Sequence, residues 1–374
     1  MRIGFDAKRA FFNQRGLGNY SRDTIRVLSN SCLGNQHFLY VPRQENRIAF
    51  DYNSDNCHLR FPEGIYSTKW LSSWWRTSKI CKDIEKDELD IYHGLSHELP
   101  YGIEKTGVKT VVTMHDVIFL KNPELFPLFD RYSFKKKYIH GCRTADRIIA
   151  VSEQTKSDLV EYMGEKEERI DVVYQGCNPM FHRPIGEERL LSTKQKYNLP
   201  SEFMLIVCAV ERRKNHELIL KAMRDPKVEL PLVVVGRPSD YQRQLQTLVH
   251  EYRLEKRVLF FNDVKQEDLP AIYKLAKIFV YPSLFEGFGI PIIEAMTVGT
   301  PVITSKGSCF KETGGDAARY VSTDNADELS EAIISILSQE DTIREMREAG
   351  FRHVSKFSDE NIARNIMNTY KKIV

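Results

Sequence analysis

Short apolar runs alternate along the whole chain with longer segments whose apolar residues recur at helical spacing. In the first half the runs are RIGFDA, HFLYVP, LDIYHG, VKTVVTM, DRIIAVS and RIDVVY, and in the second half FMLIVCAV, PLVVVG, RVLFFN, KIFVYP and TPVITS. Between them lie segments such as RRKNHELILKAM, DYQRQLQTLVHEY and QEDLPAIYKLA, which have the spacing of amphipathic helices. Strands that alternate with helices predict an α/β fold in which helices cover both faces of parallel sheets.

The alternation is interrupted once, near residues 180–200. There NPMFHRPIGEERLLSTKQKYNLPSE contains several prolines and many charges but no strand, which indicates a linker with a surface helix. We therefore expect two Rossmann-like doubly wound domains, 1–185 and 186–355, that face a central cleft. The last segment, 356–374, predicts an amphipathic helix that packs back on the first domain. Because ligands of such sheets bind at the carboxyl ends of strands, we expect the chemistry in the loops that follow them.

Composition and charge narrow the class of protein. The 374 residues include 54 lysines and arginines and 51 aspartates and glutamates, a formal net charge of +3. A chain this close to neutral has no overall attraction for nucleic acid, and we expect no such partner. Its seven cysteines are widely spaced without a C-x-x-C pair, which argues against a disulfide framework or a zinc site. The start lacks the apolar core of a signal peptide and no apolar run spans a bilayer, so we expect a cytoplasmic protein.

The segment SLFEGFGIPIIE, residues 283–294, follows the apolar run KIFVYP and carries the most informative chemistry. Gly287 and Gly289 precede a proline that suits the first turn of a helix. The backbone N–H groups and the dipole at a helix start bind phosphate, and glycine lets the backbone approach the ligand. Glu286 on the loop and Glu294 in the helix could accept hydrogen bonds from sugar hydroxyls. The pattern favours a nucleotide sugar, although Glu294 alone could equally complement the helix dipole.

The longer stretch PSLFEGFGIPIIEAMTVGTPVITS resembles the signature of retaining family 4 glycosyltransferases, whose E-x7-E motif lies in the C-terminal domain of a GT-B fold. GLGNYSR, HDVIF, AVSEQTKSDL, ERRKN and GDAARYV match the family in the same order, so the resemblance covers most of the chain. It implies an enzyme that moves a hexose from a nucleotide sugar to a glycan or lipid-linked acceptor, with retention and without a metal or another cofactor. GLGNYSR with HDVIF resembles bacterial mannosyltransferases of surface polysaccharide and lipopolysaccharide assembly, which favours GDP-mannose as donor.

The resemblance implies donor-binding roles for the motif itself. Family members contact the donor sugar through the first glutamate of the motif and the ribose through the second, roles that fall here on Glu286 and Glu294. Glu286 is therefore a candidate catalytic residue. The loop backbone would contact the sugar and the diphosphate through its amides, and this loop comprises Gly287, Phe288, Gly289 and Ile290.

A pair of cations normally holds the diphosphate in this family, and only one of the two is unambiguous here. Lys214 matches the family lysine, but the arginine usual five positions earlier is replaced by Ala209. The resemblance therefore leaves Arg213 or Arg212 as the second cation, which would stabilise the departing diphosphate together with Lys214. The alternative is that these cations belong to a solvated helix start.

In the first half, the resemblance implies that Gly16 and Gly18 of GLGNYSR approach the donor across the cleft. The segment is not a dinucleotide fingerprint, because Ser21 replaces the third glycine. HDVIF ends a strand with His115 and Asp116. The family histidine at this place contacts the donor sugar near the reacting carbon, so His115 is the main catalytic candidate. From the residues alone, His115 could equally be satisfied by backbone partners, and Asp116 could orient it, bind the acceptor or cap the next turn.

Two further segments of the first half leave alternatives open. Trp70 and Trp74 lie four positions apart and close to Trp75, and we interpret them as core residues, with an acceptor or lipid surface as the alternative. The lysine run 135–137 is interpreted as a solvated helix face. Its alternative is peripheral attachment to the anionic inner face of the cell membrane, where a lipid-linked acceptor would reside.

Proteins with other functions can have the same fold as a glycosyltransferase. A sugar-nucleotide epimerase or a phosphorylase of the same fold is one alternative, and a non-catalytic carbohydrate binder is another. The joint presence of Glu286, Glu294, Lys214 and His115 argues against an inactive relative. The sequence therefore favours a transferase.

Overall fold

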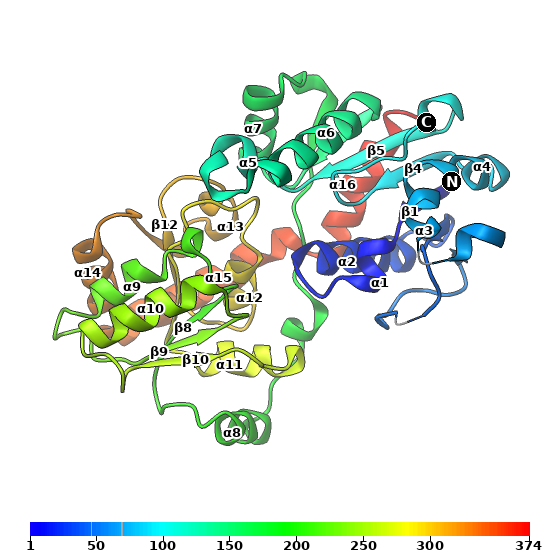
Figure 1. Ribbon diagram of the computed structural model, residues 1–374. Helices are drawn as coiled ribbons and strands as arrows, with labels where there is room; N and C mark the ends of the chain where they lie inside the picture. The colour runs from blue at the N-terminus through cyan, green and yellow to red at the C-terminus, as the bar shows by residue number, and fades with distance from the viewer. Residues whose placement is uncertain (46, 69) are drawn as a thin grey trace. The chain divides into compact units, whose positions relative to one another are not determined.

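The computed structural model describes residues 1–45, 47–68 and 70–374, which form two compact units (Figure 1). The first unit comprises Met1–Gly176 with Phe357–Val374, and the second comprises Cys177–Lys356. The division lies before the position expected from the sequence because the linker already packs on the second unit. In its short 3₁₀-helix, Phe181 is buried and its ring centroid lies 5.6 Å from that of Tyr273.

The first unit is built on a parallel sheet with the strand order β3-β2-β1-β4-β5-β6-β7. Six of these strands coincide with the apolar runs of the sequence. The edge strand β3 was missed, because its four residues CHLR are short and mostly half-buried, without an apolar run. The strands are β1 (Arg2–Asp6), β2 (Gln36–Tyr40), β3 (Cys57–Arg60), β4 (Ile91–Gly94), β5 (Lys109–Met114), β6 (Arg147–Ala150) and β7 (Ile170–Val172).

Helices of the first unit come from both ends of the chain. Helix α16 lies beside α2, where Arg26 forms an ion pair with Asp359 at 2.6 Å (Figure 1). No helix in the described part of the chain is long and apolar enough to cross a bilayer. The helices of this unit are α1 (Lys8–Phe12), α2 (Gly16–Ser31), α3 (Leu71–Trp74), α4 (Cys81–Lys86), α5 (Ile118–Lys121), α6 (Leu128–Thr144), α7 (Glu153–Met163) and α16 (Asp359–Lys371).

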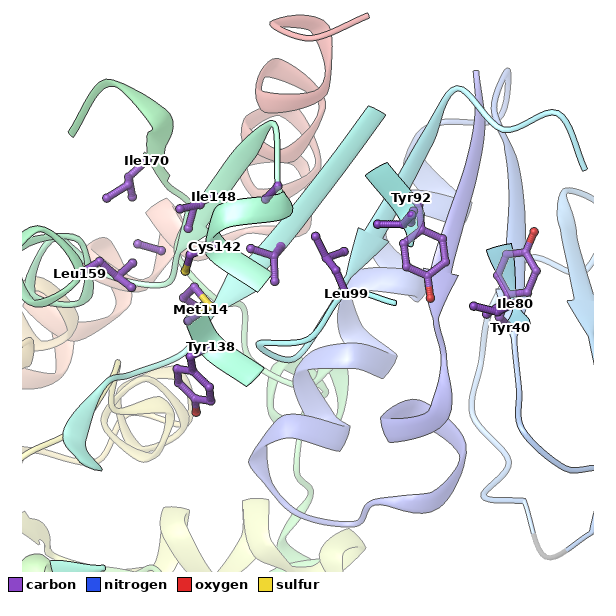
Figure 2. Close-up of a cluster of buried hydrophobic side chains, with 14 of the residues drawn as sticks. Tyr40, Ile80, Tyr92, Leu99, Met114, Tyr138, Cys142, Ile148, Leu159 and Ile170 are labelled. Carbon is purple, nitrogen blue, oxygen red and sulfur yellow. The ribbon is translucent and has the colours of Figure 1, made fainter. Parts of the chain in front are cut away.

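A buried apolar cluster joins the sheet of the first unit to helices α4, α6 and α7. Figure 2 shows Tyr92, Met114, Tyr138 and Leu159 among its members. Trp75 also belongs to it and is 2% exposed. The expectation that all three tryptophans are core residues is wrong, because the helical turn that buries Trp75 leaves Trp70 89% and Trp74 46% exposed.

The second unit repeats the architecture with a parallel sheet in the order β10-β9-β8-β11-β12-β13. Five strands coincide with predicted apolar runs, and β13 was not predicted as a strand because its sequence ARYV has a single fully buried position. The strands are β8 (Met204–Val207), β9 (Leu232–Val235), β10 (Val258–Phe261), β11 (Ile278–Tyr281), β12 (Val302–Ser305) and β13 (Ala318–Val321). The helices are α8 (Glu187–Lys196), α9 (His216–Ala222), α10 (Asp240–Glu251), α11 (Leu269–Leu275), α12 (Ile290–Thr297), α13 (Phe310–Gly314), α14 (Ala326–Leu337) and α15 (Glu340–Val354).

In both sheets the first strand lies in the middle, and later strands are added first on one side of it and then on the other. In the first unit the reversal lies between β1 and β4, and in the second between β8 and β11. Ligands of open parallel sheets bind at such a switch point, at the carboxyl ends of the strands. The loops after β8 and β11 carry Lys214 and Glu286, so the sheet order brings together two residues that are far apart in the sequence.

Six described non-glycine residues have positive φ values, and three of them lie in loops that follow strands, whereas Glu88, Asn198 and Arg253 follow helices. His97 after β4, Asn215 after β8 and Ser308 after β12 are non-glycine residues with positive φ values of 64°, 58° and 49°. Such conformations are unfavourable for L-residues and persist where the surrounding packing enforces them, commonly near functional sites. Three of the strained positions thus lie at the carboxyl ends of the two sheets.

Candidate active site

Glu286 is the centre of a polar cluster at the carboxyl ends of β8 and β11. Its Oε1 accepts hydrogen bonds from the hydroxyls of Tyr281 at 2.9 Å and Ser283 at 2.6 Å, and from the ammonium of Lys214. Its Oε2 accepts a hydrogen bond from the Arg213 guanidinium at 3.0 Å. Lys214 also donates to the Tyr281 hydroxyl at 2.8 Å. The carboxylate, the ammonium and the phenol thus form a closed hydrogen-bonded triangle.

The cluster is largely shielded from solvent. The side chains of Glu286 and Lys214 are 11% and 7% exposed. Burial alone would raise the pKa of Glu286, but the charges of Lys214 and Arg213 outweigh burial and lower that pKa to about 2. Burial lowers the pKa of Arg213 while Glu286 raises it, and the net shift is upward. Glu286 therefore faces two cations, and Arg213 also forms an ion pair with Glu211 at 3.1 Å.

The cluster keeps hydrogen-bonding capacity for a ligand. An ammonium has three donors, and Lys214 uses two of them on Tyr281 and Glu286. Arg213 donates through Nε to Glu211 and through Nη1 to Glu286 and the Phe285 carbonyl. Within the described chain its Nη2 donates to no other residue, and Oε2 of Glu286 accepts only the Arg213 bond. The cations can therefore bind phosphate oxygens, and Oε2 can accept a hydroxyl.

The neighbouring arginine points elsewhere. Arg212 donates through Nη2 to Oε1 of Gln244 at 3.1 Å, and its guanidinium lies 5.5 Å from the ring centroid of Tyr241. Both partners belong to α10. The geometry therefore pairs Lys214 with Arg213, a choice that the sequence left open.

Helix α12 follows this cluster directly in the chain. Gly289 is its N-cap with φ of 99°, a left-handed conformation that strains other residues, and Pro291 lies in the first turn. The buried thiol of Cys309 donates to the carbonyls of Glu286 at 3.3 Å and Phe288 at 3.0 Å, which fixes the backbone between them. The helix start therefore presents its amides and the positive end of its dipole, a suitable phosphate site.

The loop residues expected to contact the donor differ in exposure. Phe288 is 3% exposed and its side chain belongs to the core of the second unit. Gly287 and Ile290 are half-buried. Phe288 can therefore contribute to a ligand site only through its backbone.

Glu294 lies in the second turn of α12 and is half-buried. Its Oε2 accepts a hydrogen bond from the hydroxyl of Tyr273 on α11 at 2.8 Å. Burial and the charge of Glu294 raise the pKa of Tyr273, so the phenol keeps its proton and donates. Because dipole effects fade beyond the first turn, this glutamate is held by a specific partner rather than by the dipole alone.

In the first unit, His115 directly follows β5 and is 7% exposed. Its Nε2 lies 3.0 Å from the carbonyl oxygen of Leu95, which can only accept, so Nε2 carries the proton. Burial lowers the pKa of His115 to about 4, and the ring is neutral at pH 7. Nδ1 is then an acceptor, and it accepts no hydrogen bond from another described residue. The backbone partner of a structural histidine is present, and one nitrogen remains able to bind a hydroxyl.

A buried hydrogen-bonded chain leads from the C-terminal helix to His115. The Tyr370 hydroxyl bonds Nδ1 of His93 at 2.7 Å, and Nε2 of His93 bonds the Thr113 hydroxyl at 2.8 Å. Thr113 bonds the Tyr20 hydroxyl at 3.0 Å, and the Tyr20 ring packs edge-on against His115 at 4.5 Å between centroids. Tyr20 of α2 thus packs on the ring of His115, and the hydrogen bonds behind Tyr20 extend to Tyr370 of α16, which the sequence did not predict.

The remaining candidates of the first unit have clear structural contacts. Oδ1 of Asp116 accepts a hydrogen bond at 3.2 Å from the backbone N–H of Ile118, the first residue of α5. A Cβ added at Gly16 would meet nothing within 4 Å, whereas one added at Gly18 would lie 1.7 Å from the carbonyl oxygen of Asn13. Close packing alone therefore accounts for Gly18, and Gly16 opens α2 with an accessible surface.

A second charged cluster lies at the switch point of the first sheet and was not predicted. Arg76 binds Asp6 and Glu98, each at 2.6 Å, and Lys137 binds Glu98 at 2.9 Å. Burial raises the pKa of Glu98, but the charges of Arg76 and Lys137 have the larger effect and lower that pKa to about 2. Both carboxylates are engaged by cations. Within the described residues, no group of three or more histidine, cysteine, aspartate or glutamate side chains is arranged to hold a metal ion.

Sequence reasoning missed the hydroxyl groups that hold the two glutamates. Tyr281, Ser283 and Tyr273 each donate to one of them. A signal for Tyr281 and Ser283 was present, because Tyr281 ends the strand in the run KIFVYP and Ser283 follows it two positions later, directly before the motif. Tyr273 had no such signal, since its contact depends on how α11 packs on α12.

Comparisons with known proteins agree with this architecture. Residues 14–181 match the model of the family described as Glycosyltransferase Family 4. Residues 189–353 match the family described as Glycosyl transferases group 1. Together the two matches cover most of both units.

Among curated proteins, the chain is 32% identical over 288 residues to O-antigen chain mannosyltransferase B of Escherichia coli, covering 75% of this chain and 74% of that protein. It is 29% identical over 293 residues to serotype-specific mannosyltransferase WbdA of Escherichia coli, covering 75% of this chain but only 36% of that longer protein.

Among solved structures, sucrose-phosphate synthase of Thermosynechococcus elongatus superposes with a TM-score of 0.76 at 21% sequence identity. The superposition covers 100% of this chain and 99% of that one. A likeness at this identity concerns the fold.

Proposed function

The chain belongs to the family 4 glycosyltransferases and has their GT-B fold, and we propose that it transfers mannose from GDP-mannose to a glycan acceptor in surface polysaccharide synthesis. The O-antigen mannosyltransferase relative supports the choice of sugar and pathway. One observation carries the donor site. Glu286, Lys214 and Arg213 meet at the switch point of the second sheet, directly before the start of α12.

In this proposal the second unit binds the nucleotide diphosphate. The spare N–H groups of Lys214 and Arg213 bind phosphate oxygens, and the amides at the start of α12 bind others. These donors act most strongly when the bond to the sugar breaks, because negative charge then collects on the departing diphosphate. Glu294 binds the ribose hydroxyls from the second turn of α12.

The sugar itself is positioned by acceptors of hydrogen bonds. Oε2 of Glu286 takes one hydroxyl, and Nδ1 of the neutral His115 takes another near the reacting carbon. During transfer the acceptor oxygen forms a bond to the anomeric carbon as the bond to the phosphate oxygen breaks. The acceptor oxygen attacks from the same face that the diphosphate leaves, so the anomeric configuration is retained without a carboxylate nucleophile. The proton of the acceptor hydroxyl passes to the departing diphosphate, and no metal takes part.

We further propose that the acceptor is linked to a lipid and that the enzyme works at the inner face of the cell membrane. O-antigen synthesis by the named relative supports such an acceptor. The comparisons do not favour an epimerase, a phosphorylase or a non-catalytic binder, since the curated relatives compared above are transferases.

A thermal-shift panel of GDP-, UDP- and ADP-sugars tests the donor, because a ligand that binds the folded state raises its stability by mass action. GDP-mannose should raise the melting temperature more than the other nucleotide sugars, with or without a chelator. A larger shift with a UDP- or ADP-sugar would overturn the choice of donor. A shift that a chelator abolishes would overturn metal independence.

A further inference from the structure

Helix α6 exposes large apolar side chains in its first turns. Leu128, Phe129 and Tyr132 are 78%, 81% and 72% exposed. Among the described residues only Trp70 is a more exposed large apolar side chain than Leu128 and Phe129. Single exposed apolar residues are common on soluble proteins, but a group of three on one helix indicates an interaction surface.

The same face of α6 continues as a basic surface. At about 100° per residue, the exposed cations Lys135, Lys136 and Arg143 fall on the side of Leu128 and Tyr132. We call these side chains the α6 stripe, which consists of Leu128, Phe129, Tyr132, Lys135, Lys136 and Arg143.

Packing fixes the direction in which this stripe faces. Tyr138 and Gly141 lie away from the stripe and Cys142 lies at its edge beside Lys135; all three are buried, and Figure 2 shows Tyr138 and Cys142 within the core cluster. The core therefore uses one side of the helix, and the apolar side chains of the stripe lie outside it. The stripe cannot turn inward without unpacking the helix.

The acidic residue of α6 and the cations of the stripe lie on different sides of the helix. Its only acidic residue, Asp130, lies off the stripe. Lys137 also lies off the stripe, where it binds Glu98 at 2.9 Å. Within the described residues, none of the three cations of the stripe forms an ion pair. The interpretation of the lysine run as one solvated face is therefore wrong for Lys137.

Apolar and basic surface continue together into a neighbouring concavity. A groove of about 200 Å³ lies beside the stripe and shares Lys135 and Arg143 with it. The rest of the lining is mostly apolar and consists of Phe119, Leu120, Ile139, Tyr162, Met163 and one acid, Glu165, which is paired with Arg169 at 2.9 Å. The surface therefore offers apolar contact and positive charge over more than one helix.

We propose that the α6 stripe docks this protein on an anionic lipid bilayer. Leu128, Phe129 and Tyr132 insert at the boundary between headgroups and acyl chains, as the apolar face of an interfacial helix does. The three cations then lie against lipid phosphates, where each adds electrostatic attraction. Charge complementarity selects the bilayer over a second copy of the chain, because a symmetric contact would face three unpaired cations with three more.

The inference rests on the proposed function for its purpose, since a lipid-linked acceptor would be reached at such a surface. Its test does not, because binding to vesicles is measured without donor or acceptor. We would sediment the full chain with vesicles of phosphatidylcholine, with and without phosphatidylglycerol. The chain should bind the anionic vesicles and release from them as the salt concentration rises.

Two variants separate the apolar and the electrostatic parts. Leu128→Ser with Phe129→Ser should weaken partitioning into anionic vesicles about tenfold or more, because two apolar side chains no longer insert. Lys135→Gln with Lys136→Gln should weaken it about tenfold and reduce its dependence on salt. Matched controls in the second unit, Leu191→Ser and Lys227→Gln with Lys256→Gln, alter exposed residues and should bind as the wild type does.

Equal binding of the wild type and both α6 variants would overturn the proposal, as would equal binding to neutral and anionic vesicles. If sedimentation velocity shows a dimer that Phe129→Ser dissociates while vesicle binding is unchanged, the stripe is a contact between copies and the proposal is wrong. A thermal shift with GDP-mannose in the same samples reports the donor site, so a protein that binds the nucleotide sugar but no vesicle contradicts only this inference.

Discussion

Glu286 accepts hydrogen bonds from Tyr281 and Ser283, which lie at the end of β11 and just after it. It also accepts hydrogen bonds from Arg213 and Lys214, which lie in the loop after β8. Without this carboxylate, two cations would be left close together and shielded from water, which is unfavourable. A residue identified by its motif as a sugar ligand therefore has a second task, to hold the diphosphate-binding cations in position.

The two neighbouring arginines provide a matched pair for a test at this scale. Arg213→Met should reduce kcat/KM about 10²–10³-fold, because a donor to the departing diphosphate is lost. Arg212→Met should leave kcat/KM within about twofold, since Arg212 faces α10. Steady-state kinetics with GDP-mannose would measure both, and equal losses in the two variants would refute the assignment of the clamp.

Glu286→Gln should lower kcat/KM by a similar factor, about 10²–10³-fold, while the protein remains folded. The amide keeps the shape but removes the charge that positions Lys214 and Arg213. Kinetics together with far-ultraviolet circular dichroism would measure this. A folded variant with normal turnover would exclude Glu286 from the site.

At the scale of elements, the two glycines at the start of α2 differ: close packing explains Gly18, and an open surface is found at Gly16. The family segment GLGNYSR led us to expect that Gly16 and Gly18 both serve the donor. Close packing against Asn13 already requires Gly18, whereas the surface of Gly16 is open. Sequence spacing could not distinguish them, because the contact depends on the loop before the helix.

Gly18→Ala should therefore lower the free energy of unfolding by about 1–3 kcal/mol, because the added methyl overlaps a backbone carbonyl. Gly16→Ala should change it by no more than about 0.5 kcal/mol. Urea denaturation of both variants is the measurement. If Gly18→Ala proves as stable as Gly16→Ala, the packing explanation fails.

Helix α16 is tied to the core of the first unit by the hydrogen bond between Tyr370 and His93. Tyr370→Phe should destabilise the protein by about 1–3 kcal/mol, because a buried imidazole nitrogen loses its partner. Tyr162→Phe on α7 alters a more exposed hydroxyl and should have little effect. Comparable stability of both variants in urea denaturation would show that the bond contributes nothing.

Across the whole molecule, buried histidines make folding depend on pH. Burial lowers the pKa of His37, His115 and His216 to about 4 and that of His93 to about 3. Below about pH 6.5 the unfolded chain binds protons that the folded chain does not, so stability is complete above that pH and declines toward pH 4. Glu286 adds nothing in this window, because its ion pairs are lost only below about pH 4.5.

The free energy of unfolding should therefore fall by at least about 2 kcal/mol between pH 7 and pH 5. His37→Leu should make this decline shallower, since one proton fewer is taken up on unfolding. Urea denaturation at several pH values would measure the slopes. Stability that is constant from pH 7 to pH 5 would contradict the pKa shifts.

The pattern of apolar runs predicted the α/β class and eleven of the strands, because parallel strands buried on both faces leave a strong signal in the sequence. It could not predict β3 and β13, whose outer positions are partly exposed. The motif gave Glu286, Lys214 and His115. Tyr273, which bonds Glu294, and Tyr20, which packs against His115, remained hidden, since these contacts depend on how helices pack.

The central claim is that the cluster of Glu286, Arg213 and Lys214 binds the diphosphate of a nucleotide sugar. Isothermal titration calorimetry of the wild type and of Lys214→Met with GDP-mannose tests it most directly. The wild type should bind, and the variant should bind at least about tenfold more weakly, because a charge-assisted hydrogen bond is lost. Equal affinities, or no binding of GDP-mannose or any other nucleotide sugar by the wild type, would contradict the claim.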